Sequence, residues 1–343
     1  MDEKRSRKKA TATEVAELAG VSKYTVLRAF KDGASISPHS REAVMAAADK
    51  LGFRPNLLAR SLKNQKTHLI AMLVDEFQNP HTLMILDEVT KQLGERGYMT
   101  ILFNVGSDDK YMSVLNMAGQ MQVDGMIFAA TILRDELIVM SKELYQVPSF
   151  HICRSTDNPH VDVVNIDGYE ASRQLGDLLI QQGYQRYAYM KGHDTPSSQL
   201  MRVDGYRASL KEANLQLDKT FIAGHYDREL SYKLIKDYLE STPENERIDA
   251  LFCENDVLAV GAIQAVRDFG QGAHIGIVGF DDIDEARTTT WELTTWSQRA
   301  DLQITEAINR LIDGIADEDG TWRLGEIRVR KSHLKPVDCR SKV

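Results

Sequence analysis

Apolar residues recur at helical spacing three times within the first 52 positions of the chain. The stripes lie at 12–19, 23–30 and 38–51. Residues that repeat every three or four positions share one face of an α-helix, so each stripe predicts one buried helix face. The residues assigned to these faces are Val15, Leu18, Ala19, Val26, Phe30, Val44, Ala47, Ala48 and Leu51.

Capping residues mark the ends of the first two predicted helices. Thr11 and Glu14 have the spacing of a capping box, in which each side chain satisfies a free backbone N–H of the other residue. Gly20 suits a turn that needs a positive φ. Ser22 is a natural N-cap for a second helix over 23–30.

Polar residues form the outward face of this second helix. Arg reads guanine edges, Thr and Tyr contact bases or phosphates, and Lys attracts phosphate. Two short helices joined at a glycine turn have the layout of a helix-turn-helix, whose second helix enters the major groove. The predicted DNA contacts here are Ser22, Lys23, Tyr24, Thr25, Arg28 and Lys31. A three-helix module that docks onto a protein is the alternative interpretation.

A third helix is predicted after Ser37, because an N-cap followed by Pro38 at the first helical position is a common helix start. Gly52 is expected to end it. Three short helices around a small core predict an all-α headpiece over residues 1–54.

From residue 69 onward the pattern changes to short apolar strands alternating with amphipathic helices. Strands are predicted at 69–74, 99–105, 124–130, 148–152 and 162–166, with helices at 81–97 and 112–121. The alternation starts again with helices at 169–182, 199–213, 232–239 and 257–269 and strands at 186–192, 220–226, 249–256 and 274–280. Such alternation predicts parallel, doubly wound α/β sheets, and two consecutive sets predict two lobes.

Charge is distributed unevenly between the head and the body of the chain. Residues 1–66 contain 14 Lys and Arg against 7 Asp and Glu, whereas the remainder contains 28 against 43, within a net charge of -8. A basic head on an acidic body indicates that the head alone meets a polyanion. A solvated basic tail is the simpler interpretation for residues 4–9.

The composition favours a cytoplasmic protein with no membrane partner. No apolar run approaches the roughly 20 residues that span a membrane, and no apolar stretch follows the charged N-terminus as it would in a secretory signal. Cys153, Cys253 and Cys339 lie far apart, are odd in number and form no C-x-x-C pair. We therefore expect reduced thiols, not disulfides or a zinc site.

The N-terminal segment "ATEVAELAGVSKYTVLRAF", followed by "ISPHSREAVMAAADKLGFRPNLLARSL", resembles the start of a LacI/GalR-family transcriptional regulator. The V-A-x-x-A-G-V-S-x-x-T-V core, the G-F-x-P-N join and the following A-x-x-L carry the resemblance. It implies a homodimer that binds a palindromic operator, and a two-lobed core like that of periplasmic binding proteins. A small effector, either a sugar or a sugar acid, is expected in the cleft between the lobes.

The resemblance also implies a hinge helix over residues 55–67. Asn56 is expected to cap this helix and Arg60 to contact DNA. Ala59 is expected close to the central base pairs, with Leu62 as an apolar wedge in the minor groove, where inserted side chains kink the duplex. Packing of Leu62 on the core is the alternative. The core is then 68–343, with an N-lobe of about 68–167 plus 298–326 and a C-lobe of about 168–297 plus 327–343.

Effector contacts are carried over from the family pattern onto polar residues that follow predicted strands. Arg202, Asn255 and Asp281 match family contact positions, whereas Asp256 is expected to cap the following helix. Ligands of parallel α/β sheets bind at the carboxyl ends of the strands, where Asn255 and Asp281 are expected. Further candidates, for which surface or packing roles compete, are His81, Thr82 and Tyr226.

Two residues depart from the sugar-binding pattern. Cys153 stands where many members carry Asp, which removes a strong acceptor for hydroxyl groups. Arg154 follows it and, together with Arg202, favours an acidic sugar or a phosphorylated ligand. A nucleoside or purine effector is the alternative within the same type of regulator.

No enzyme motif accompanies this pattern, so no catalytic residue and no cofactor is predicted. The chain lacks G-x-x-x-x-G-K-[ST], H-E-x-x-H and G-x-S-x-G. Its nine histidines show no metal-ligand spacing, so no metal site is predicted. An enzyme or a solute-binding protein on the same two-lobed core remains the alternative class, since fold alone does not decide function.

Overall fold

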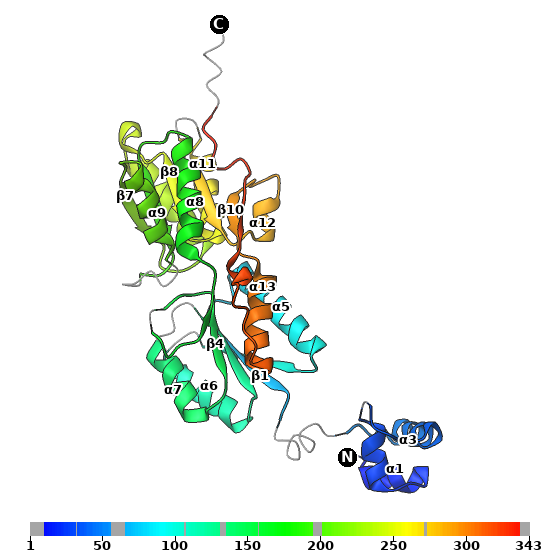
Figure 1. Cartoon of the computed structure of the whole chain (residues 1–343). Coiled ribbons are helices and arrows are strands. Elements are labelled where there is room, and N and C mark those ends of the chain that lie inside the picture. Colours follow the sequence, from blue (N-terminus) through cyan, green and yellow to red (C-terminus); the bar gives the residue numbers. More distant parts are fainter. Residues whose placement is uncertain are drawn as a thin grey trace, which may run out of the picture. The chain divides into compact units, whose positions relative to one another are not determined.

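The computed structural model describes residues 10–31, 33–55, 66–105, 108–130, 135–156, 158–194, 201–270 and 273–336, and at 108–110 it describes the backbone alone. The chain divides into two compact units, Met1–Thr67 and His68–Val343 (Figure 1). None of the helices in the described ranges is long and apolar enough to cross a membrane.

The described part of the first unit contains the helices α1 (Ala12–Ala19), α2 (Lys23–Ala29) and α3 (Pro38–Leu51). The predicted capping box is present, with the Thr11 N–H donating to the Glu14 carboxylate at 2.7 Å and the Glu14 N–H donating to the Thr11 hydroxyl at 3.3 Å. Gly20 ends α1 with a φ of 66°. The helix starts and stops of this unit therefore follow from local capping chemistry.

The headpiece core differs from the predicted stripes at two leucines. Its buried residues are Val15, Ala16, Val26, Ala29, Val44, Ala47, Ala48 and Phe53. Leu18 is 47% exposed and Leu51 is 38% exposed, so their predicted burial is wrong. In α1, Ala16 is buried beside Val15 where Leu18 was expected, and beyond α3 the Phe53 ring enters the core, with its centroid 5.8 Å from that of Phe30.

The N-lobe of the second unit is a parallel sheet of five strands within the described residues, in the order β2-β1-β3-β4-β5. Its strands are β1 (Leu69–Val74), β2 (Met99–Asn104), β3 (Gly125–Ala129), β4 (Ser149–Ile152) and β5 (Val163–Val164). Its helices are α5 (Pro80–Glu95), α6 (Asp108–Gln120) and α7 (Asp135–Tyr145). Crossover helices on both faces explain why β1 and β3 are apolar throughout.

The C-lobe sheet has the order β11-β10-β9-β8-β6-β7 within the described residues, and only its β10–β11 pair is antiparallel. Its strands are β6 (Tyr187–Lys191), β7 (Leu217–Ile222), β8 (Ala250–Cys253), β9 (Gly276–Phe280), β10 (Thr294–Ser297) and β11 (Glu326–Arg328). Its helices are α8 (Gly168–Gln181), α9 (Arg202–Glu212), α10 (Arg228–Ser241), α11 (Asp256–Phe269) and α12 (Asp284–Arg287). The expected two-lobed, doubly wound α/β core is confirmed.

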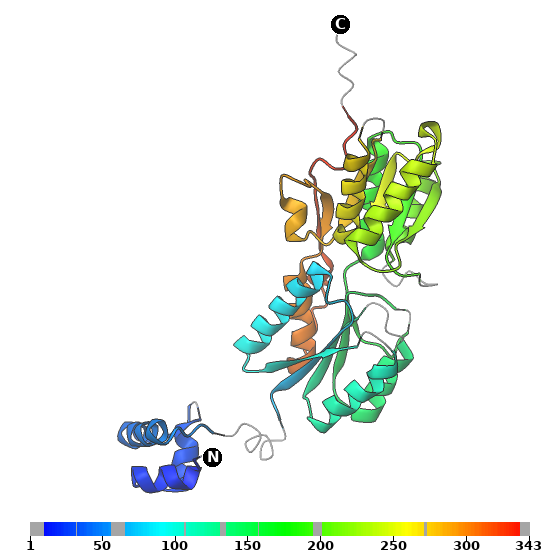
Figure 2. The same ribbon diagram turned by 180° about the vertical axis from the view of Figure 1, so that it is seen from behind.

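The chain crosses between the lobes after β5, after β10 and before β11. Between the last two crossings, α13 (Ala300–Ile308) returns to the N-lobe and packs beside α5 (Figures 1 and 2). Trp322, just before β11, is buried in the N-lobe core. Met84 on α5 packs against the C-lobe core, so the two lobes touch directly.

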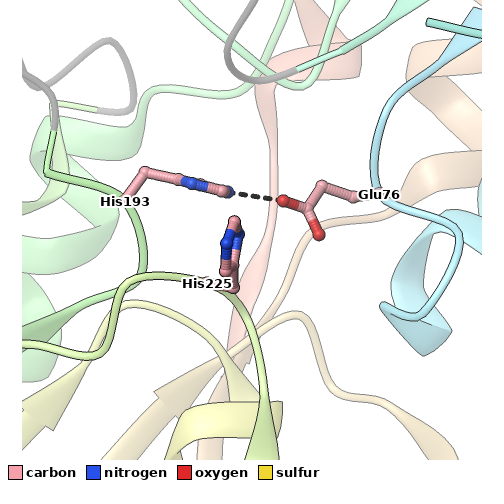
Figure 3. A group of neighbouring side chains, drawn as sticks. All are labelled: Glu76, His193 and His225. Carbon is pink, nitrogen blue, oxygen red and sulfur yellow. Dashed lines mark hydrogen bonds and ion pairs between the residues drawn. The ribbon is translucent and has the colours of Figure 1, made fainter. Parts of the chain in front are cut away.

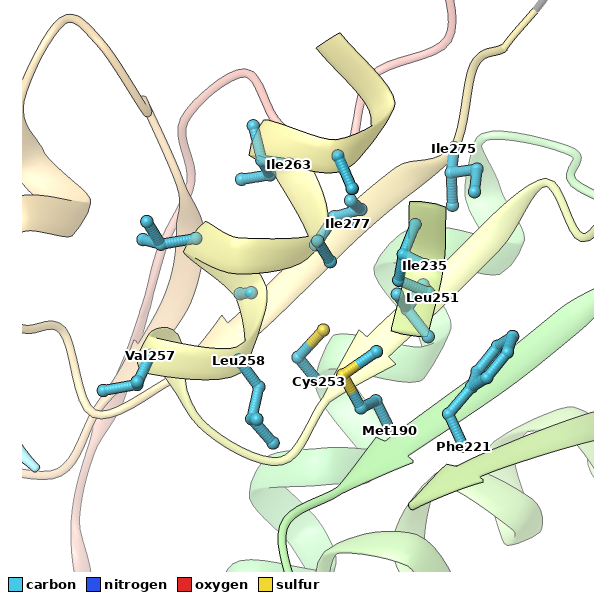
Figure 4. Close-up of a cluster of buried hydrophobic side chains, with 14 of the residues drawn as sticks. Met190, Phe221, Ile235, Leu251, Cys253, Val257, Leu258, Ile263, Ile275 and Ile277 are labelled. Carbon is cyan, nitrogen blue, oxygen red and sulfur yellow. The ribbon is translucent and has the colours of Figure 1, made fainter. Parts of the chain in front are cut away.

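One C-lobe core cluster lies between its sheet and the pair α10 and α11 (Figure 4). Leu251 and Cys253 of β8 meet Met190 of β6 and Leu258 of α11 in this cluster. Burial raises the pKa of the Cys253 thiol well above its usual value. Cys253 is therefore a small apolar core residue and not a reactive thiol.

Candidate functional sites in the headpiece and between the lobes

The N-terminus of α2 presents polar side chains to solvent. Lys23 is exposed and Tyr24 is 64% exposed, whereas Ser22 and Thr25 hydrogen bond to each other through their hydroxyls at 2.9 Å. The Ser22 hydroxyl also accepts from the Thr25 N–H at 3.1 Å, so it caps α2 as predicted. The cap fixes the start of α2, and Lys23 and Tyr24 remain free to reach a partner.

Arg28 is anchored within the headpiece. Its guanidinium donates to the carbonyl of Ser35 and lies 5.6 Å from the centroid of the Tyr24 ring. Lys31 is exposed. The predicted hinge contacts Asn56, Ala59, Arg60 and Leu62 lie outside the described residues.

Asp281 is the centre of a polar cluster between the lobes. Its Oδ1 atom accepts from Gln298 Nε2 at 2.5 Å and lies 3.8 Å from Arg202 Nη2 and 3.9 Å from His81 Nδ1. These four side chains, all at least 90% buried, are called the Asp281 cluster below. His81 comes from the N-lobe and Asp281 and Arg202 from the C-lobe, so the cluster joins three of the predicted effector residues across the lobes.

Backbone geometry places these groups. His81 is in the first turn of α5, which Asn79 caps by accepting from the His81 N–H at 3.1 Å. Asp281 follows β9 with a φ of 114°. Burial lowers the pKa of His81, with Asp281 opposing the shift, so the ring is neutral at pH 7.

Arg202 is held by two contacts besides Asp281. Its guanidinium lies 3.7 Å from the centroid of the Phe280 ring and donates through Nη1 to the carbonyl of Glu254. Among the described residues, its buried Nε atom has no hydrogen-bond partner. One donor of the fork is thus available to a ligand.

Glu254 is a buried carboxylate that the sequence analysis did not select. Its oxygens accept from Tyr189 at 3.2 Å, from Tyr226 at 3.0 Å and from the Gly192 N–H at 2.9 Å. Tyr226 is therefore committed through its hydroxyl to Glu254, and its ring packs edge-to-face on His193. Glu254 directly follows β8, and the strand-end rule used for Asn255 would have found it.

Asn255, and not Asp256, caps α11. Its Oδ1 atom accepts from the Leu258 N–H at 3.0 Å, so the predicted capping role of Asp256 is wrong. Asp256 instead accepts from the Thr295 hydroxyl and the Ile283 N–H, and burial raises its pKa well above the usual value. The Nδ2 atom of Asn255 is buried and, within the described part of the chain, has no acceptor.

Cys153 and Arg154, the two departures from the sugar-binding pattern, lie in different surroundings. Cys153 is close enough to Asp281 and Arg202 for both charges to act on it, and burial is the main reason that its pKa rises to about 12. Arg154 is buried and pairs with Asp135 at 2.5 Å, on the N-lobe side. No contact in the described residues joins Arg154 or the half-buried Thr82 to the Asp281 cluster.

A second interlobe contact is formed by Glu76, which follows β1. Its Oε1 atom lies 2.5 Å from Nε2 of His193, which follows β6. The ring of His225, after β7, stands at 85° to that of His193 with a centroid separation of 5.1 Å. Figure 3 shows all three side chains directed at one another from the two lobes.

Family comparison agrees with both parts of this architecture. Residues 67–326 match the family of periplasmic binding proteins and the sugar binding domain of the LacI family, and residues 11–56 match the bacterial regulatory proteins of the lacI family. The chain belongs to the LacI family of bacterial regulatory proteins. It is a DNA-binding transcriptional regulator with an effector-binding core, as the motifs implied.

Individual relatives extend over nearly the whole chain. The HTH-type transcriptional repressor PurR of Mannheimia succiniciproducens is 27% identical over 334 residues, covering 95% of this chain and 99% of its own. PurR of Erwinia tasmaniensis is 29% identical and covers 90% and 91%. The lac repressor dimer bound to operator and the anti-inducer ONPF superposes with a TM-score of 0.82 at 22% identity, covering 96% and 100%. The regulator CelR in complex with cellobiose gives 0.66 at 25% identity, covering 94% and 99%.

Proposed function

We propose that this LacI-family chain represses transcription as a cytoplasmic homodimer on a palindromic operator, and that a small molecule at the Asp281 cluster changes its affinity for that operator. The headpiece, residues 1–54, reads the two half-sites through α2. Residues 55–67 transmit the state of the core. PurR and the lac repressor, named above, are transcriptional repressors, and no catalytic role is assigned to this chain.

One observation carries the effector proposal. Buried polar atoms at the junction of the lobes, Nδ2 of Asn255 and Nε of Arg202, have no hydrogen-bond partner among the described residues. Buried polar groups in folded proteins are nearly always paired, and leaving one unpaired costs about 1–3 kcal/mol. A ligand that supplies acceptors to both atoms recovers this free energy and is selected by it.

The charge balance favours a neutral, hydroxyl-rich ligand over an acidic one. Arg154 has Asp135 as its partner and Arg202 faces Asp281, so neither cation needs an anionic ligand to neutralise it. Sugar hydroxyls act both as donors to Asp281 and as acceptors from Arg202 and Asn255. The cellobiose complex of CelR supports the same class of ligand. The sequence favoured a sugar acid because of Arg154 and Arg202, and the carboxylates beside these two residues remove that reason.

A nucleoside or purine base is the alternative effector class. Similarity to repressors named PurR is the reason to include it. A flat base would pack against an aromatic face, and Phe280 already has the Arg202 guanidinium on one side. Experiment can distinguish the two effector classes. A base gains most of its binding free energy from stacking, whereas a sugar gains most of it from hydrogen bonds to Asp281.

Effector control follows from differential binding. A ligand that prefers the lobe arrangement in which the headpieces are positioned for DNA acts as a corepressor, and one that prefers the other arrangement acts as an inducer. The size of the change in operator affinity equals the ratio of ligand affinities for the two states.

A thermal-shift screen of neutral sugars, sugar acids, nucleosides and purines on the full chain tests the effector proposal. A bound effector raises the unfolding temperature by mass action. The hit is then added to the chain on an inverted-repeat duplex selected from random DNA, and fluorescence anisotropy should show a changed Kd. A ligand that binds without changing that Kd would contradict the allosteric part. Failure to select any inverted repeat would contradict the operator part.

A further inference from the structure

Glu76, His193 and His225 offer metal-ligand atoms that all lie within 4.8 Å of one another. We propose that these three side chains bind one divalent transition-metal ion, with Zn²⁺ as the best match, and that the ion joins the two lobes. The set is assembled only by the tertiary fold, because its members follow three different strands. It is called the interlobe triad below.

The donor atoms of the triad suit a metal ion of intermediate hardness. Two imidazole nitrogens with one carboxylate oxygen form a donor set typical of Zn²⁺, and such three-ligand sites leave a fourth position for water or a ligand. Ca²⁺ and Mg²⁺ are disfavoured because they require oxygen donors almost exclusively. Asp75 and Glu254 add negative charge near His193, as their effect in raising its pKa shows, and this charge also attracts a cation.

The geometry requires two small movements. Bonds of 2.0–2.2 Å in a tetrahedral site place ligand atoms about 3.3 Å apart. Glu76 and His193 are closer than this, because a hydrogen bond joins Nε2 of His193 to Oε1 of Glu76 at 2.5 Å, so the two side chains must separate slightly. His225 is exposed, so its ring is free to turn inward toward the ion.

The strands that carry the triad set its position firmly. β6 and β7 are hydrogen-bonded neighbours in parallel register, from Tyr187 opposite Leu217 to Lys191 opposite Ile222, so the two histidines leave the same sheet edge. Glu76 leaves the N-lobe sheet shortly after β1. In this strand, the five residues that come after Leu69 are all buried. A bound ion would therefore tie the C-lobe edge at β6 and β7 to the N-lobe edge at β1.

This position has a consequence for regulation, which rests on the proposed function. Tyr226 contacts the ring of His193 and also hydrogen bonds Glu254, whose carbonyl holds Arg202 of the Asp281 cluster. The ion and the effector thus act on one connected set of side chains and on the same lobe arrangement. By linkage, each changes the affinity of the other by the same factor.

Isothermal titration of Zn²⁺ into the untagged, metal-stripped full chain tests the site without DNA or effector. We expect one ion per chain, and an affinity at least about tenfold lower in each of Glu76→Gln, His193→Gln and His225→Gln, since even outer partners of metal ligands are worth 10–100-fold. His160→Gln, which changes an exposed histidine of the N-lobe, is the matched control and should bind as the wild type does. His225→Gln alters an exposed side chain, so its fold should be intact by circular dichroism.

Equal Zn²⁺ affinity in the wild type and all three triad variants, or no binding by the wild type at micromolar concentrations, would overturn the site. A Zn²⁺-dependent rise of the unfolding temperature in the wild type and the control, absent from the triad variants, supports it. Because these measurements use neither operator nor effector, their failure would leave the proposed function standing. An operator affinity that fails to respond to sugars or bases would conversely leave the metal site standing.

Discussion

Gln298 Nε2 donates to Asp281 Oδ1 at 2.5 Å, and the same oxygen lies 3.8 Å from Arg202 Nη2. The amide and the guanidinium therefore converge on one oxygen atom of a buried carboxylate. Gln298 lies in the crossing from β10 to α13. Asp281 follows a strand of the C-lobe sheet, and it therefore connects that sheet to the segment that links the lobes. We therefore expect a ligand that binds Asp281 to disturb this link.

Asp281→Asn is expected to weaken effector binding by at least about tenfold, or about 1.4 kcal/mol. The substitution removes the negative charge opposite Arg202 and turns two acceptor oxygens into one acceptor and one donor. Asparagine has the same shape as the aspartate that already adopts the φ of 114° at this position, so the backbone should be unchanged. Isothermal titration with the effector found in the screen provides the measurement.

Asp268→Asn is the control for this change, because Asp268 is an exposed residue of α11. It should leave effector affinity within twofold of the wild type, and both variants should bind operator normally without effector. An undiminished effector affinity in Asp281→Asn would remove the Asp281 cluster from the proposed site.

Arg28→Ala is expected to weaken operator binding by about 1–3 kcal/mol, the range for losing a bidentate base contact, and to leave effector binding unchanged. On DNA, the guanidinium would exchange its contact with the Ser35 carbonyl for a base edge. Anisotropy titrations at several salt concentrations should show a shallower salt dependence if Arg28 contacts phosphate instead.

Arg207→Ala, an exposed arginine of α9 in the second unit, is the matched control for Arg28→Ala. Because Arg28 also braces the turn at Ser35, the unfolding of each variant is followed by circular dichroism. Loss of effector binding in Arg28→Ala, with intact headpiece folding, would show that the division between reading and sensing is wrong.

Much of the architecture could be predicted because local chemistry sets it. Capping residues define α1 to α3, and the alternation of apolar strands and helices gave the two lobes. The helix α7 was missed because the apolar run Leu137–Met140 is continuous and carries no helical period. The crossing elements β10 and α13 were missed as well, and Gln298 was missed with them.

The candidate site was predictable only where a family motif or the end of a strand marks a residue. Arg202 was found from the family motif and Asp281 from its place after a strand, and the structure places the two side chains 3.8 Å apart. The partnership of Glu76 with His193 depends on two lobes meeting, and no spacing along the chain encodes it. Arg154 misled the prediction of ligand charge because its partner Asp135 lies in the unpredicted α7.

Gly205→Ala is expected to destabilise the second unit, because a Cβ atom there would lie 2.0 Å from the Tyr169 carbonyl oxygen. Backbone cannot move aside as a flexible side chain can, so α8 and α9 must separate, at a cost of about 1–3 kcal/mol. Gly94→Ala is the matched control within α5, where a Cβ meets nothing within 4 Å. It should stabilise by about 0.5–1 kcal/mol, since glycine weakens a helix interior. Equal unfolding temperatures for the two variants would contradict the close packing of α8 on α9.

The interlobe hydrogen bond between His193 and Glu76 should make stability depend on pH. The hydrogen bond to Glu76 is the main reason that the pKa of His193 is raised; burial opposes the shift, and the charges of Glu76, Asp75 and Glu254 add to it. A group whose pKa is raised by folding stabilises the folded state fully below its unfolded pKa of about 6.5, and this contribution disappears as the pH rises through the folded value.

The comparison of wild type with His193→Gln in the presence of a chelator measures this contribution. The unfolding temperature of the wild type should exceed that of the variant below pH 6.5, and the difference should shrink as the pH rises above that value. His151 acts in the opposite sense, because burial lowers its pKa to about 3 and its protonation favours unfolding in acid. Since His151 is present in both proteins, its effect cancels in the difference. A difference that is constant from pH 5 to pH 9 would show that His193 does not hold the lobes together through its charge.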